Sequence, residues 1–176
     1  MHEMEKVRNR KLAEPLIKAL NNRNMEACFV ETKEEALNKA LEMIPEGSKV
    51  SWGGVMSAHE IGLIKAIKEG NYVALDREGE SDPAEKQRIE KQVFTDCDYF
   101  LVSANGMSEN GVIVNIDGNS NRVAAFAYGP KHVIVIVGMN KVVHTEEDAY
   151  QRAKYIAAPI NAQRFGLDTP CAQLGK

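Results

Sequence analysis

The chain has 176 residues, with 22 Lys and Arg, 25 Asp and Glu, and a formal net charge of −3. Both signs of charge are interspersed, so the sequence has no basic stripe to neutralise a phosphate backbone, and we predict no nucleic-acid partner. No apolar run approaches the ~20 residues that cross a bilayer. The first residues are charged, unlike those of a signal peptide, and we predict a cytoplasmic protein with no membrane span.

This length fits one domain that buries its own core without disulfides or metals. We predict a single domain over residues 1–176, in which residues 1–24 form a densely charged helical appendage. Three widely spaced cysteines, Cys28, Cys97 and Cys171, argue against a disulfide framework and against a self-contained metal site. We predict reduced, mostly structural thiols.

Apolar residues at helical spacing alternate with short β-branched runs, a pattern typical of parallel strands joined by helices. The pattern predicts helices over residues 4–22, 33–43, 58–69, 83–94 and 146–157. It predicts strands over residues 27–30, 49–52, 72–75, 99–103, 112–116 and 132–137. The last strand is almost continuously apolar, as a strand covered on both faces would be. We therefore predict an α/β fold.

Three of the predicted helices begin with the spacing of a capping box or its acidic variant. The pairs are Ser57 with Glu60, Asp82 with Glu85, and Thr145 with Asp148, and Pro83 stands where a first helical residue tolerates proline.

The first chemical feature is a glycine turn, Gly53-Gly54, between a predicted strand and the helix that Ser57 would cap. Gly53, Gly54 and Ser57 are candidate ligand-binding residues. Glycines let an anionic group approach the backbone closely, and a helix N-terminus adds positive potential, so phosphate or carboxylate binding is one interpretation. A tight strand-to-helix turn without a ligand is the other, and the turn alone favours neither.

The second feature is the loop from Asn105 to Gly111, between two predicted strands. Asn105-Gly106 favours a turn with positive φ, and Gly111 allows a hairpin. Because loops after parallel strands face the ligand crevice, Asn105 and Glu109 are candidates for substrate contact, with Glu109 as nucleophile or general base. The loop by itself favours the alternative, in which Glu109 is a solvated hairpin residue.

The third feature is a polar cluster of candidate ligand-binding residues: Asp117, Gly118, Asn119, Asn121 and Arg122. Asp and Asn side chains also bind their own backbone in turns, which is a purely structural account. Arg122 would either clamp a carboxylate or phosphate, or pair with Asp117 or Glu109. Lys141, after the last predicted strand, is a candidate second cation. We place the site within residues 103–129.

Several ordered motifs resemble the LUD family, whose name denotes the lactate-utilisation domain. They are NIDGNSNRVAA at residues 115–125, GPKHVIV at 129–135, GMNKV at 138–142, WGG at 52–54, EIGL at 60–63, AAPINA at 157–162 and TPC at 169–171. The resemblance implies a three-layer fold with a mostly parallel sheet flanked by helices, shared with sugar-phosphate isomerases, glucosamine-phosphate deaminases and coenzyme A transferases. It also implies a link to bacterial oxidation of lactate to pyruvate alongside iron–sulfur partner proteins.

Two departures from the family pattern bear on chemistry. Related proteins often carry further cysteines beyond the position of Cys171, which this chain lacks, so we predict no metal there. Ser108-Glu109-Asn110-Gly111 is similar to the motif that carries the nucleophilic glutamate of class I coenzyme A transferases, which implies attack of Glu109 on an acyl thioester. Such transferases need two homologous halves, which a homodimer would supply.

We predict a protein that binds a small anionic metabolite or a coenzyme A-like ligand between the glycine turn and residues 105–122. Its predicted role is in lactate utilisation with iron–sulfur partners, and no cofactor is assigned. The alternatives are an acyl-CoA transferase that uses Glu109 or a sugar-phosphate isomerase-like enzyme, and the sequence leaves open whether the protein is an enzyme or a binding subunit.

Overall fold

The computed structural model describes residues 3–176, so residues 1 and 2 of the predicted appendage lie outside the described residues. The chain forms two compact units, whose segments alternate along the sequence. Unit 1 comprises Met1–Glu31, Ala104–Ile116 and Val137–Lys176, and unit 2 comprises Thr32–Ser103 and Asp117–Ile136.

Unit 2 is built on a four-stranded sheet whose strand order is β2-β1-β3-β6, with every neighbouring pair parallel. Its strands are β1 (Lys49–Trp52), β2 (Val73–Leu75), β3 (Tyr99–Val102) and β6 (His132–Val135). Its helices are α2 (Lys33–Glu42), α3 (Met56–Glu60), α4 (Leu63–Glu69), α5 (Pro83–Thr95) and α6 (Asn121–Tyr128).

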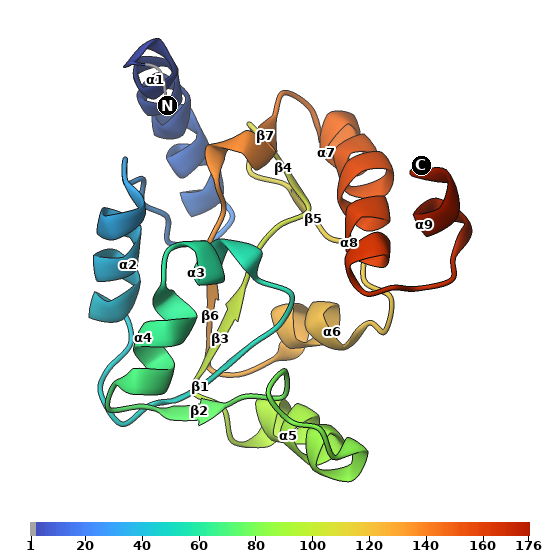
Figure 1. Ribbon diagram of the computed structural model, residues 1–176. Helices are drawn as coiled ribbons and strands as arrows, with labels where there is room; N and C mark the ends of the chain where they lie inside the picture. Colours follow the sequence, from blue (N-terminus) through green and yellow to red (C-terminus); the bar gives the residue numbers. More distant parts are fainter. Residues whose placement is uncertain (1–2) are drawn as a thin grey trace. The chain divides into compact units, whose positions relative to one another are not determined.

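Alternating side chains cover both faces of this sheet. One face carries Val50, Trp52, Leu101 and Ile134 and packs against apolar residues of α2, α3 and α4. The other carries Phe100, Val102, Val133 and Val135 and packs against α5 and α6. The two helical layers can be followed on either side of the strands in Figure 1. The predicted three-layer α/β fold with a mostly parallel sheet is confirmed.

The strand order reverses between β1 and β3. From β1 the chain passes through α3 and α4 to β2 on one side, whereas from β3 it continues to β6 on the other side. A reversal of this kind separates the loops that leave the two central strands, and it leaves a crevice beyond their carboxyl ends.

Unit 1 contains α1 (Glu3–Asn21), a small sheet of order β5-β4-β7, and the C-terminal helices. Its strands are β4 (Gly106–Ser108), β5 (Ile113–Val114) and β7 (Val142–Val143), preceded by the 3₁₀ helix η1 (Met139–Lys141). The helices are α7 (Glu146–Arg152), the π-helical segment η2 (Ala153–Ala157), α8 (Ala158–Arg164) and α9 (Pro170–Leu174). Leu16 of α1, Met107 and Val142 form its apolar centre.

Several predicted elements differ in the structure. Residues 27–30 form no strand, and the predicted strand 112–116 is reduced to Ile113–Val114. The predicted helix 58–69 is divided at Gly62, which has φ 80° and opens α4. The predicted helix 146–157 continues to Arg164 through the π-helical segment. The elements β4, β7 and α9 were not predicted.

The structure contains some of the predicted helix caps and lacks others. Thr145 and Asp148 form a complete capping box, and the Asp82 side chain accepts a hydrogen bond from Ala84 N. The prediction for Ser57 is wrong, because α3 starts at Met56, two residues before the predicted start, with Val55 at its N-cap.

The hairpin prediction was right about one glycine and wrong about the other. Gly111, at φ 82°, stands in the turn between β4 and β5, which pair in antiparallel fashion. The predicted turn at Asn105-Gly106 is wrong, since Gly106 is the first residue of β4.

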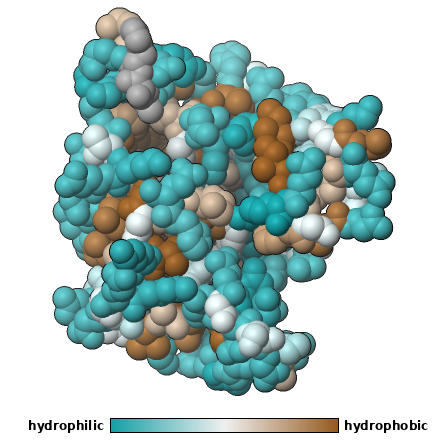
Figure 2. Space-filling model, in the orientation of Figure 1, coloured by the Kyte–Doolittle hydropathy of each residue, from teal (hydrophilic) through white to brown (hydrophobic). Residues whose placement is uncertain are grey.

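Charged and polar residues cover most of the surface visible in Figure 2, with smaller hydrophobic patches between them. None of the helices in residues 3–176 has the length and apolar character required to cross a membrane.

Gly106 permits close packing between β4 and α7. A Cβ atom at this position would lie 2.4 Å from the carbonyl oxygen of Ala149, which is fully buried. We expect Gly106→Ala to lower the free energy of unfolding by about 1–3 kcal/mol, measured by urea denaturation, because backbone must move to accommodate the methyl group. The matched control is Gly118→Ala, where the added Cβ would meet no heavy atom within 4 Å. Equal denaturation midpoints for the two variants would contradict this packing.

The cysteines differ in accessibility. Burial raises the pKa of the Cys97 thiol to about 11, whereas Cys28 is exposed. At pH 8 the thiolate fraction of Cys97 is then about one in a thousand, and the thiolate is the reactive form. We expect iodoacetamide to modify Cys28 well before Cys97 in the folded protein, as followed by peptide mass spectrometry, and this order to disappear in urea. Equal native rates would show that Cys97 is not protected.

Candidate functional site

The carboxyl ends of β1 and β3 bring together backbone and hydroxyl groups from three strand ends. Gly53, directly after β1, donates its N–H to Leu101 O of β3 at 3.2 Å. Ser103 is buried directly after β3, and its hydroxyl donates to Ile136 O at 2.7 Å. Its Oγ also lies 3.3 Å from Ser57 Oγ. The reversal of strand order therefore places Ser57 at the edge of the sheet where ligands of parallel α/β folds bind.

Arg122 extends beside the glycine turn. It is only 8% exposed, although α6 has begun just one residue earlier. A Cβ added to Gly53 or Gly54 would lie 3.4 Å from the Cγ or Cδ of Arg122, respectively, so the two glycines leave the space that the arginine stem fills. Gly54 has φ 56°, a conformation that favours glycine.

Asp117 orients this arginine. Its Oδ2 accepts the N–H of Val123 at 3.0 Å and lies 3.9 Å from the Nε of Arg122. The structural ion pair that was one of the two interpretations of Arg122 is thus formed with Asp117. The same carboxylate satisfies an amide in the first turn of α6, where negative charge is favourable.

The residue before α6 adopts an uncommon conformation. Ser120 has φ 60° and forms the N-cap in the left-handed region, which a residue with a Cβ occupies at some cost in conformational energy. Strained backbone of this kind concentrates at ligand-binding and catalytic sites. Ser120 lies between Asp117, which is in the loop, and Arg122, which is in the first turn of α6.

A small pocket lies under the glycine turn. Its volume is about 20 Å³, room for about one water molecule. Its lining includes Trp52, Gly53, Arg77, Glu90, Val93, Phe94, Phe100, Asn121, Arg122 and Ala125. Glu90 of α5 is hydrogen-bonded to Asn121 Nδ2 at 3.2 Å and forms an ion pair with Arg77. A metabolite does not fit inside the pocket as it stands, so a ligand would contact its rim at the glycine turn.

The structure gathers part of the predicted site in unit 2. Gly53, Gly54, Asp117, Asn121 and Arg122 belong to one cluster, and Ser57 lies at the same sheet edge. Gly118 and Asn119 are exposed in the loop that precedes α6.

The remaining predicted residues, Asn105, Glu109 and Lys141, belong to unit 1. Asn105 is buried, and its Oδ1 accepts the N–H of Ile116 at 2.8 Å. Its carbonyl oxygen accepts a hydrogen bond from Arg152, a guanidinium whose pKa is lowered by burial. These bonds connect β4 to the segment after β5 and to α7. They account for the burial of Asn105, and its contact with a ligand stays a prediction.

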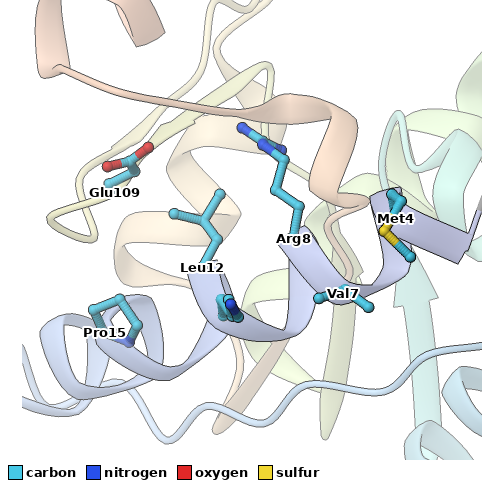
Figure 3. Close-up of a pocket in the computed structure, with 7 residues that line it drawn as sticks. Met4, Val7, Arg8, Leu12, Pro15 and Glu109 are labelled. Atoms are coloured by element: carbon cyan, nitrogen blue, oxygen red, sulfur yellow. The ribbon is translucent and has the colours of Figure 1, made fainter.

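Glu109 lines a larger and more open groove along α1. The groove has a volume of about 530 Å³ and is bounded by Met4, Val7, Arg8, Lys11, Leu12, Pro15 and Glu109. Figure 3 shows Leu12 and Arg8 projecting from α1 on the side where Glu109 lies. Glu109 is not simply solvated, because its Oε2 lies 3.0 Å from His144 Nδ1 and its side chain is 35% exposed.

Sequence reasoning did not single out Ser103, Arg77 or Glu90. Ser103 ended a predicted strand and could have been found by its position. Arg77 and Glu90 stand among other charged residues of a loop and a helix, and nothing in the sequence separates them from solvated side chains. Within residues 3–176, no group of three or more His, Cys, Asp or Glu side chains is arranged to hold a metal ion.

Comparison with known proteins gives one result for the whole chain. The family model described as the LUD domain matches residues 13–176. Neither the curated proteins nor the solved structures provided a match. The matched range contains both the sheet edge with Arg122 and the loop with Glu109, and the chain belongs to the LUD domain family.

Proposed function

We propose that this protein binds a small anionic metabolite at the carboxyl ends of β1 and β3, through the glycine turn and Arg122. The observation that carries the proposal is the position of Arg122 against Gly53 and Gly54, at the point where the strand order reverses. A guanidinium stays charged at physiological pH and presents several donors to a carboxylate or phosphate.

The family supports a role in lactate utilisation, in which the protein acts alongside iron–sulfur partner proteins. Lactate and pyruvate each carry one carboxylate, the group that an arginine binds in bidentate fashion. The cytoplasmic location belongs to the same proposal. The binding site is assigned to unit 2 alone, since its glycine turn, hydroxyl groups and arginine all belong to that unit.

Changing Gly54 tests the site directly. We expect Gly54→Ala to weaken binding of lactate, pyruvate or inorganic phosphate about tenfold, equivalent to about 1.4 kcal/mol, because the added methyl group lies against the Arg122 side chain, 3.4 Å from its Cδ, and strains a turn residue at φ 56°. Isothermal titration calorimetry would measure the dissociation constants, and the ligand-induced rise in Tm would give a second reading.

The matched control is Gly47→Ala. Gly47 also has a positive φ, 81°, but a Cβ there would meet nothing within 4 Å. Both variants carry backbone strain, and only Gly54→Ala places a methyl group against Arg122. Equal affinities in the two variants, or affinity unaffected by Arg122→Lys, would refute binding at the glycine turn.

The position of Glu109 supports acyl transfer as a second candidate function. A partly buried carboxylate next to a groove of about 530 Å³, with Arg8 and Lys11 on its wall, suits an acyl thioester with an anionic carrier. The Glu109 carboxylate would attack the thioester carbonyl, giving an acyl–glutamyl anhydride and a thiolate. The thiolate would then attack the Glu109 carbonyl and release the acyl group as a carboxylate. A homodimer would provide the two halves that such transferases need.

This candidate predicts a covalent intermediate. After incubation with an acyl-CoA ester, we expect intact-mass spectrometry to detect a coenzyme A adduct on the wild-type protein and none on Glu109→Gln. Glu146→Gln is the control, because Glu146 is an exposed carboxylate of the same unit that accepts a hydrogen bond from Asn110. An adduct that persists in Glu109→Gln, or is absent from the wild type, would eliminate acyl transfer through this residue.

A further inference from the structure

Glu90 supplies a negative charge to the pocket beneath the proposed anion site. The side chain comes from α5 and is 34% exposed. Its Oε1 accepts a hydrogen bond from Asn121 Nδ2 at 3.2 Å and is in contact with Arg77 Nη1. Asn121 is the first residue of α6 and directly precedes Arg122 in the chain. Glu90 thus reaches the same short segment that presents the arginine.

Charges of both signs line or border this pocket. Arg77 and Arg122 are two cations, and Glu90 and Asp117 are two carboxylates, with Asp117 Oδ2 at 3.9 Å from Arg122 Nε. Both the attraction of a bound anion by the arginines and its repulsion by the carboxylates grow in proportion to the charge of the ligand. The repulsion that Glu90 contributes is therefore about twice as large for a dianion as for a monoanion in the same position.

The carboxylate also limits space. With Glu90 held by Arg77 and Asn121, the pocket retains only about 20 Å³. A phosphoryl group cannot enter this volume to pair with both arginines. A ligand at the rim instead meets Arg122 from the side of Gly54, while Glu90 offsets the second cation, Arg77.

We propose that Glu90 is a specificity-determining residue that lowers the affinity of the anion site for dianions, such as phosphate esters and sulfate, more than its affinity for monoanions, such as monocarboxylates. This inference rests on the proposed binding of an anion at Arg122. It assigns the selection of ligand charge to α5, a helix that lies outside the glycine turn and the polar loop.

The test compares a monoanion with a dianion at constant ionic strength and pH 8. Pyruvate and sulfate are titrated calorimetrically into the wild-type protein, Glu90→Gln and Glu85→Gln. Glu85 is the matched control, because it lies on the same helix and pairs with Arg88 away from the pocket. Glutamine at position 90 keeps the size of the side chain and an acceptor for Asn121 and removes the charge.

We expect Glu90→Gln to strengthen sulfate binding about tenfold and pyruvate binding only about threefold, because the logarithm of the change scales with ligand charge. Glu85→Gln should leave both constants unchanged. Should Glu90→Gln not fold, Arg77→Gln provides the opposite change and should weaken sulfate binding more than pyruvate binding. Equal changes for the two anions, or no change for sulfate, would overturn the inference.

Arg122→Lys separates this inference from the function on which it depends. If Arg122→Lys weakens pyruvate binding and Glu90→Gln leaves the preference for pyruvate over sulfate unchanged, the site is correct and the role of Glu90 is wrong. If Arg122→Lys affects neither anion, or if neither anion binds to any of the proteins, the proposed site and the inference fall together.

Discussion

Coverage of both faces of the four-stranded parallel sheet is the constraint on which unit 2 depends. Alternating side chains of each strand face α2, α3 and α4 on one side and α5 and α6 on the other. Helices can cover two faces only if the crossovers leave the sheet in opposite directions, and the strand order then reverses within the sheet. In this protein the reversal occurs between β1 and β3. The glycine turn, Ser57 and Ser103 lie at that point because the hydrophobic core requires it.

The composition of the central strands made this part of the fold predictable. The strands predicted at 49–52 and 99–103 are observed at Lys49–Trp52 and Tyr99–Val102. The second is continuously apolar, as a strand buried on both faces is expected to be. The strands of unit 1 were not predictable in the same way. β5 and β7 have two residues each, too few for any periodicity, and the pairing of β7 with β4 joins residues that are distant in the chain. The division of the predicted helix at Gly62 and the π-helical segment likewise depend on packing in the folded protein.

The candidate site shows the same division. Glycines, an arginine and an aspartate within two short segments were identifiable from the sequence, because turn-forming residues next to a fixed cation are uncommon in a pure scaffold. The sequence analysis placed a ligand between the glycine turn and residues 105–122, but it did not identify the contact between Gly54 and Arg122. These two residues are 68 positions apart and meet only through the crossovers of the sheet. Glu90 could not be distinguished from other acidic residues on its helix. Glu90 differs from those residues because it accepts a hydrogen bond from Asn121. The spacing of residues along α5 does not predict that contact.

The interleaving of the two units constrains how the protein can be made and divided. The polypeptide passes from one unit to the other after residues 31, 103, 116 and 136, so neither unit is a continuous stretch of chain. During synthesis, α1 leaves the ribosome long before β4, β7 and α7, which belong to the same unit. Until those elements are synthesised, the apolar side chains of α1 cannot pack against them. Contacts between such distant segments slow folding through the entropy of closing long loops. A single cut anywhere between residues 31 and 137 divides at least one unit, so an exchange of one unit between relatives would have to transfer several separate segments.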